Sequence, residues 1–336
     1  MILAVKATIA GSAAELQYVV IGDTNTPFLS AYPWDAGFGA KLADPAVLPA
    51  TFTDEVTFSY ANDAVFSVCG ASPYINAYAW TAGFGTKYAD PATLPVTGAS
   101  GVDIRIGDDA VAVAMSGSPY VAAYPWSAGF GAKYANPATL PPGFQRAVNW
   151  SPSGNDIAIV GGTAPRIGAY AWSAGWGTKY ANAPTDLALS GYDVAWSPSG
   201  NDIAAGMQSS PYVRAYPWSA GFGTAYAAPA TAPTGLGNAL TWSPDGNDIA
   251  VAHASSPYIS TYNWSSGWGT KYANPATLPT GNGIGVAFSS TGDDIIVAHV
   301  NSPYVSAYPW SAGFGTKYAD PATLPNGNGR AVAMTK

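Results

Sequence analysis

The chain has 336 residues, of which 48% are hydrophobic and only 10% are charged, and its net charge is −7. This composition excludes a disordered chain, and the sparse Lys and Arg residues argue against a nucleic-acid partner, because neutralising phosphates needs clustered cations. The single cysteine, Cys69, excludes a disulfide framework, and no apolar run is long enough to predict a transmembrane helix.

A repeat of 46 residues organises the sequence. Its marker is a tryptophan that opens a Trp-x-x-Gly-(Phe/Trp)-Gly turn and recurs without insertion or deletion. A fixed period of this size predicts a repeat architecture rather than a pair of conventional domains. The seven copies are Trp34, Trp80, Trp126, Trp172, Trp218, Trp264 and Trp310.

The chain begins with a segment outside the repeat, residues 1–14, which is expected to form an N-terminal arm. A signal peptide is the weaker interpretation of this segment, because its apolar run precedes Lys6, whereas in a signal peptide the positive charge comes first. From residue 17 onward the sequence fills the strand positions of the first repeat.

Each repeat divides into four short segments separated by turn residues, for example 283–289, 294–299, 304–310 and 316–319. Four strands per repeat are typical of a β-propeller blade. Both faces of the third segment are apolar, so each blade is expected to pack between two neighbours, with large rings facing small residues. The tyrosines that are identical in all seven repeats fit such a packing site: Tyr32, Tyr78, Tyr124, Tyr170, Tyr216, Tyr262 and Tyr308.

The end of the chain predicts how the ring closes. Residues 330–335 repeat 146–151, so 329–336 form an eighth copy of the first strand. We expect this strand to complete the first blade; the alternative is that residues 2–9 take its place. The sequence therefore predicts one all-β domain over residues 1–336, a seven-bladed β-propeller of four-stranded repeats closed by the C-terminal strand.

The repeat resembles two known patterns. Val194 to Ala204 (VAWSPSGNDIA), followed by a third strand that ends in Trp218, is similar to WD40 repeats, although no Gly-His pair opens the unit. The phrase SPY-x-x-x-Y-x-W-x-x-GFGTKYANPATLP resembles propeller repeats of bacteriophage virion proteins. These resemblances imply a propeller that serves as a scaffold or docking module, in the tail or on the capsid of a virus particle.

Lysines recur in the fourth strand of six repeats. If that strand is outermost, a charge there protects an exposed sheet edge from pairing with another chain. A ring of lysines that binds an anion is the alternative, and it is weaker because lysines on an outer rim lie far apart. The residues are Lys41, Lys87, Lys133, Lys179, Lys271 and Lys317.

Aromatic rings recur between the glycines of the turn after each tryptophan. They are possible ligand platforms, because propellers that bind sugars repeat an aromatic contact and gain avidity from it. The competing interpretation is that each ring packs under its own blade and fixes the turn. The residues are Phe38, Phe84, Phe130, Trp176, Phe222, Trp268 and Phe314.

No catalytic constellation stands out. His253 and His299 share one repeat position and are expected to pack at strand ends rather than to bind a metal. The pair Asp54 and Glu55 has no His or Lys close in sequence. We therefore predict no catalytic residues, no cofactor and no metal.

The functional prediction is a non-catalytic docking scaffold of a phage particle, located in the virion, with other virion proteins as partners and neither nucleic acid nor membrane insertion. The alternative is a multivalent glycan-binding propeller for host recognition. An enzyme is the third hypothesis, and it would depend on a residue that departs from the repeat consensus.

Overall fold

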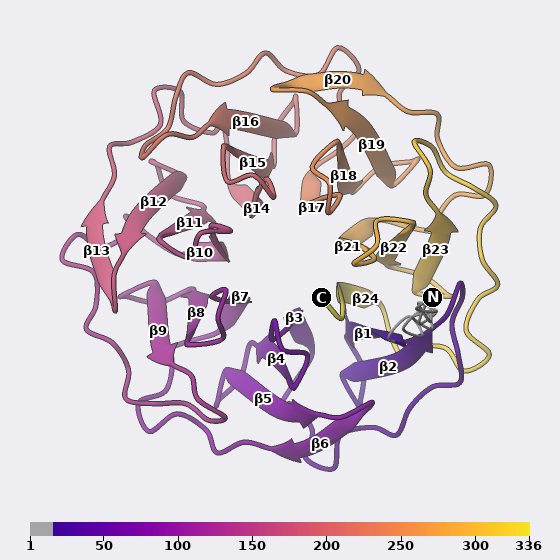
Figure 1. Ribbon diagram of the computed structural model, residues 1–336, viewed down its shortest axis with the longest axis horizontal. Helices are drawn as coiled ribbons and strands as arrows, with labels where there is room; N and C mark the ends of the chain where they lie inside the picture. The colour runs from indigo at the N-terminus through magenta and orange to yellow at the C-terminus, as the bar shows by residue number, and fades with distance from the viewer. Residues whose placement is uncertain (1–15) are drawn as a thin grey trace, which may run out of the picture.

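The computed structural model describes residues 16–336, so the predicted N-terminal arm lies outside the described residues. Seven antiparallel sheets stand around a central axis like the blades of a propeller (Figure 1). This arrangement confirms the predicted all-β, seven-bladed fold. Residues 16–336 contain no helix long and apolar enough to cross a membrane.

Each blade begins at the axis and runs outward (Figure 1). From the axis outward, the strands are β24 (Gly329–Met334), β1 (Gln17–Asp23) and β2 (Leu29–Trp34) in blade 1; β3 (Thr53–Phe58), β4 (Ala64–Cys69), β5 (Ile75–Trp80) and β6 (Phe84–Lys87) in blade 2; β7 (Ala99–Ile104), β8 (Ala110–Met115) and β9 (Val121–Pro125) in blade 3; β10 (Gln145–Trp150), β11 (Asp156–Gly161), β12 (Ile167–Trp172) and β13 (Trp176–Lys179) in blade 4; β14 (Gly191–Trp196), β15 (Asp202–Met207) and β16 (Val213–Pro217) in blade 5; β17 (Gly237–Trp242), β18 (Asp248–His253), β19 (Ile259–Trp264) and β20 (Trp268–Lys271) in blade 6; and β21 (Gly283–Phe288), β22 (Asp294–His299) and β23 (Val305–Pro309) in blade 7.

The two ends of the described chain close the ring. The C-terminal strand β24 pairs antiparallel with β1, with Ala333 opposite Val20. Beyond the ladder, the Thr335 amide donates to the Tyr18 carbonyl and the Tyr18 amide donates to Thr335 Oγ1, both at 3.0 Å. Closure by the C-terminal strand is therefore confirmed.

The fourth strand is regular in three blades and shrinks to a single bridge in the other four. The difference correlates with the residue at one position of the third strand. Where the fourth strand forms, this residue is Ala79, Ala171 or Asn263. Proline has no amide hydrogen to donate to a fourth strand, so pairing is reduced where it occupies this position. The prolines are Pro33, Pro125, Pro217 and Pro309.

The core lies between blades rather than within them. The buried hydrophobic side chains of residues 16–336 form seven clusters, each shared by two adjacent blades. In one of them Trp150, Tyr170 and Trp172 of blade 4 pack on Ala112 and Ala123 of blade 3. The predicted contact of large rings with small residues on the next blade is confirmed.

The tyrosine that is identical in every repeat is fully buried. In six blades its hydroxyl donates to a threonine carbonyl in the loop that leaves the preceding blade, as Tyr124 does to Thr93 at 2.9 Å. The exception is Tyr78, whose hydroxyl is buried without a partner in the described part of the chain. The equivalent loop position there is Val47.

This exception gives a matched pair of substitutions. Tyr124→Phe removes a buried hydrogen bond and should lower the free energy of unfolding by about 1–2 kcal/mol. Tyr78→Phe removes a hydroxyl that has no partner in the described part of the chain, so the free energy of unfolding should stay unchanged or rise. Urea unfolding of both variants tests this; equal losses would contradict it.

Candidate functional site

A channel runs along the axis between the innermost strands. It holds a cavity of about 180 Å³ lined by first-strand residues. At one end, two further cavities of about 430 Å³ each begin at residues shared with it, among them Thr57 and Thr241. The polar side chains of the channel are Glu55, Thr57, Asp103, Asn149, Asp193 and Thr241.

These polar residues replace small ones. At the repeat position of Glu55 and Asp193, the other five blades carry Gly101, Ala147, Ala239, Gly285 and Ala331. Two residues further along the strand, three blades carry Ala195, Ala287 and Ala333, and the other four carry Thr57, Asp103, Asn149 and Thr241. Side chains of a strand alternate between its faces, so residues two apart are expected to share the inner side. The departures from Gly and Ala at these two positions therefore gather at the axis.

Asp103 of β7 is fully engaged in joining two blades. Its Oδ2 accepts hydrogen bonds from the Trp150 amide at 2.9 Å and from Asn149 Nδ2 at 2.8 Å, and its Oδ1 accepts from the Ile104 amide at 2.9 Å. Burial raises its pKa, which the Lys336 ammonium and these donors oppose. Its role is therefore to hold blade 4 against blade 3.

Asp193 of β14 and Glu55 of β3 have fewer partners. Asp193 accepts the backbone amides of Leu240 and Val194, both at 2.8 Å. Glu55 accepts only its neighbour's amide, Val56, at 3.1 Å. Both carboxyls are half-buried and line the same cavity, which leaves acceptor positions for another molecule.

Burial and mutual repulsion set the protonation of this pair. Burial raises the pKa of Asp193 to about 7, and the nearby Asp103 carboxylate adds to the effect. Burial also raises the pKa of Glu55 well above its usual range, with Asp193 contributing repulsion. The channel thus holds two carboxyls whose pKa values are both raised, that of Asp193 to about 7, an arrangement that suits acid–base chemistry.

Lys336 brings a positive charge to the channel mouth. Its ammonium lies 3.7 Å from the centroid of the Tyr60 ring, and burial lowers its pKa. It lines both 430 Å³ cavities. Within residues 16–336 no group of three or more His, Cys, Asp or Glu side chains is placed to hold a metal ion.

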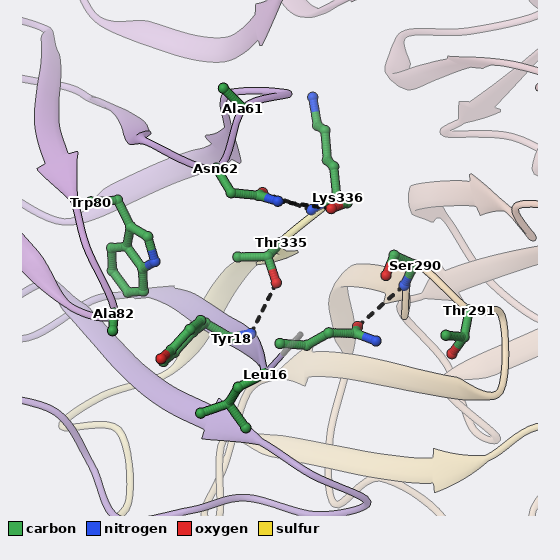
Figure 2. Close-up of a pocket in the computed structure, with 11 residues that line it drawn as sticks. Leu16, Tyr18, Ala61, Asn62, Trp80, Ala82, Ser290, Thr291, Thr335 and Lys336 are labelled. Carbon is green, nitrogen blue, oxygen red and sulfur yellow. Dashed lines mark hydrogen bonds between the residues drawn. The ribbon is translucent and has the colours of Figure 1, made fainter. Parts of the chain in front are cut away.

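Another cavity, of about 580 Å³, lies at the closure of the ring. Figure 2 shows the rings of Trp80 and Tyr18 on one side of it, Ser290 and Thr291 on the other, and Thr335 between them. In its lining only Lys336 carries a charged side chain. This seam cavity offers hydrogen-bonding groups but no carboxyl side chain, so the axial channel is the better candidate for catalysis.

The predicted aromatic platforms do not come together. Each ring is half-buried and meets the tyrosine or tryptophan of its own blade edge-on, as Phe38 meets Trp34 at 5.0 Å and Trp176 meets Trp172 at 5.6 Å between centroids. This geometry matches the packing interpretation of these rings. Their use as ligand platforms has no geometric support here.

The predicted lysines also stay apart, one in each of six blades. Each is hydrogen-bonded to an Asp or Asn three residues further along, as Lys179 Nζ is to Asn182 Oδ1 at 2.6 Å. Three of the pairs are ion pairs: Lys41 with Asp44, Lys87 with Asp90 and Lys317 with Asp320. The structure does not gather them into an anion site.

Sequence reasoning missed the axial residues because it judged carboxylates by their neighbours in sequence. Asp54 is not isolated: it forms an ion pair with Arg330, and Glu55 faces a cavity with Asp193 of another blade. The usable signal was an acidic residue, in two of the seven blades, at a repeat position that is otherwise Gly or Ala.

Replacement of Glu55 tests its burial. Burial raises the pKa of Glu55 in the folded protein well above its usual range, so the wild-type protein loses stability as pH rises above the usual glutamate pKa, because there only the unfolded chain ionises freely. Glu55→Gln keeps an acceptor for Val56 and cannot ionise. Its free energy of unfolding relative to wild type should therefore rise between pH 5 and pH 8 by at least about 1 kcal/mol. Urea unfolding of both proteins at several pH values measures this difference. If the free energies of unfolding of wild type and Glu55→Gln change with pH in parallel, Glu55 is not buried as described.

The fold is similar to those of solved bacterial proteins. A protein of Lactobacillus plantarum has a TM-score of 0.78 and 14% identity, over 96% of this chain and 100% of that one. The periplasmic gluconolactonase of Pseudomonas aeruginosa has a TM-score of 0.71 and 15% identity, over 96% and 99%. A proposed 6-phosphogluconolactonase of Bacteroides uniformis has a TM-score of 0.66 and 15% identity, over 93% and 99%. No protein-family model matches the chain, and no curated protein sequence is similar to it.

These comparisons correct the functional prediction. The sequence predicted a non-catalytic phage scaffold, with a glycan-binding propeller as the alternative, and no enzyme, whereas two of the similar structures named above are a gluconolactonase and a proposed 6-phosphogluconolactonase. The predicted WD40 and virion resemblances and the virion location gain no support. The error arose because repeated residues were taken as the site, whereas the axial carboxyls are unrepeated. Identities this low show the shared fold alone, so the chain's own activity is a proposal.

Proposed function

We propose that this propeller is a hydrolase that opens a small sugar lactone in the axial channel. The observation that carries the proposal is the pair Asp193 and Glu55 in one half-buried cavity, where burial raises the pKa of Asp193 to about 7 and that of Glu55 well above its usual range. The lactonase names of structures with the same fold support the choice of reaction.

The reaction needs one proton acceptor and one proton donor. A water molecule attacks the lactone carbonyl carbon while the Asp193 carboxylate takes a proton from that water. The ester bond to the ring oxygen then breaks, and this oxygen receives the proton of the Glu55 carboxyl. The product is the hydroxy acid. Asp193 then passes its proton to Glu55, directly or by exchange through solvent, which restores the starting state.

The shape of the channel limits the substrate. Ligand cavities usually measure roughly 300–1,000 Å³, and the carboxyl-lined cavity of about 180 Å³ is smaller. It suits a single sugar ring. The adjoining mouth, lined by Trp150, Trp196 and Lys336, offers entry and apolar surface for the face of such a ring.

Asp193→Asn tests the proposed base. A positioned general base contributes roughly 10²- to 10⁴-fold, so the variant should hydrolyse glucono-δ-lactone at least about 100-fold more slowly than wild type, after subtraction of spontaneous hydrolysis. Proton release in a pH-stat measures the rate. The control is Asp320→Asn, which changes a carboxylate on the rim. Wild-type rates no faster than spontaneous hydrolysis for every aldonolactone would refute the proposal.

The pH profile provides a second check. Because Asp193 must be ionised and burial raises its pKa to about 7, kcat/KM should rise tenfold per unit below that value and level off above it. Loss of the Glu55 proton should lower kcat/KM where this carboxyl ionises, well above the usual glutamate range. A profile that is flat from pH 5 to pH 8 would exclude Asp193 as the base.

A further inference from the structure

Two arginines occupy the same repeat position beside the carboxyl-lined cavity but have different partners. Arg330 of blade 1 is paired: its guanidinium forms an ion pair with Asp54 of blade 2, with Nε 3.0 Å from Oδ1, and lies 4.7 Å from the Phe52 ring centroid. Its charge is therefore compensated within the protein.

Arg146 of blade 4 has no such acid. The next blade carries Tyr192 at the position that corresponds to Asp54. The Arg146 guanidinium lies 4.2 Å from the Tyr192 ring centroid and 5.2 Å from that of Phe144. Among residues 16–336 it has no ion pair or hydrogen bond, and its Nε is buried without a partner. The guanidinium packs against the two rings, and within the described residues its hydrogen-bond donors are unused.

The position of Arg146 relates it to the proposed reaction. It immediately precedes Ala147, which lines the carboxyl-lined cavity, and the ring on which it packs, Tyr192, immediately precedes Asp193. Its charge also acts on Asp54 of blade 2, whose pKa it helps to lower against the raising effect of burial. An anion bound to the Arg146 guanidinium would lie against the Tyr192 ring, one residue along the strand from the proposed base.

We propose, on the basis of the lactonase function above, that the substrate is a lactone with one carboxylate, which Arg146 binds. A guanidinium offers paired donors that match the two oxygens of a carboxylate. A neutral lactone would leave the Arg146 charge uncompensated. A phosphate, with a charge of about −1.5 to −2, would bring excess negative charge next to Asp54, Glu55 and Asp193. The chemical class is thus the lactone of a sugar diacid.

The test compares lactones that differ in charge. The values of kcat/KM are measured for glucono-δ-lactone, a glucarolactone and 6-phosphogluconolactone. Wild type should prefer the glucarolactone over both others by at least about tenfold. In Arg146→Met the ratio of glucarolactone to gluconolactone should fall at least about tenfold, through KM.

Two further variants separate binding from folding. Tyr192→Asp places an acid where Asp54 stands beside Arg330, so it should pair with Arg146 and lower the same ratio. Arg330→Met removes the paired arginine and should leave the ratio unchanged, whatever its effect on stability. Thermal unfolding of each variant confirms that the measured protein is folded.

The outcomes distinguish the two proposals. A preference for 6-phosphogluconolactone, or a ratio unaffected by Arg146→Met, overturns the carboxylate assignment while the lactonase proposal stands. If wild type hydrolyses no lactone, the lactonase proposal fails, and calorimetric binding of the open acids decides the site. If wild type binds glucarate more tightly than gluconate and Arg146→Met loses this difference, the carboxylate site is supported. Equal binding of the two acids by wild type overturns it.

Discussion

Seven first strands converge on one axis, and the space between them restricts what their inner positions can carry. At Gly101 an added Cβ would lie 2.6 Å from the Arg146 carbonyl oxygen, and at Gly285 it would lie 3.1 Å from the Ala331 Cα atom. Small residues are therefore required where neighbouring strands nearly touch. At the equivalent position of two blades stand Glu55 and Asp193, and both side chains line the one cavity on the axis.

The same convergence determines the chemistry of these carboxyls. Taking a carboxylate away from water disfavours its charged form, so its pKa rises unless hydrogen bonds or cations compensate. Asp103 receives such compensation from the next blade, whereas Glu55 has a single amide donor. The remaining cost is offset by the seven clusters between blades, which hold the inner strands in place. A rigid frame that tolerates destabilised groups is what a preorganised catalytic site requires.

The sequence was sufficient for the architecture because each repeat carries the same packing information. The constant spacing of the tryptophans predicted seven blades, and the match between residues 330–335 and 146–151 predicted closure by β24. The prolines of the third strand would also have predicted the reduced fourth strand, because the missing amide hydrogen is a local property.

The candidate site could not be predicted from the repeated residues. Glu55 and Asp193 are three repeats apart, and their proximity depends on closure of the whole ring. Reasoning from repetition led instead to rings such as Phe38 and lysines such as Lys179, which pack or pair within their own blades. In a repeat protein the unrepeated residue carries the functional information, and Arg146 with Tyr192 in place of an acid is a second example.

The central claim is that closure gives two distant carboxyls raised pKa values in one channel. Carboxyl-carbon NMR of protein labelled at Asp and Glu, with assignments from Asp193→Asn and Glu55→Gln, measures these values directly. The account predicts that the Asp193 signal titrates near pH 7 and that the Glu55 signal titrates above the usual glutamate range. If both signals titrate below pH 5, the channel is open to water and the account is wrong.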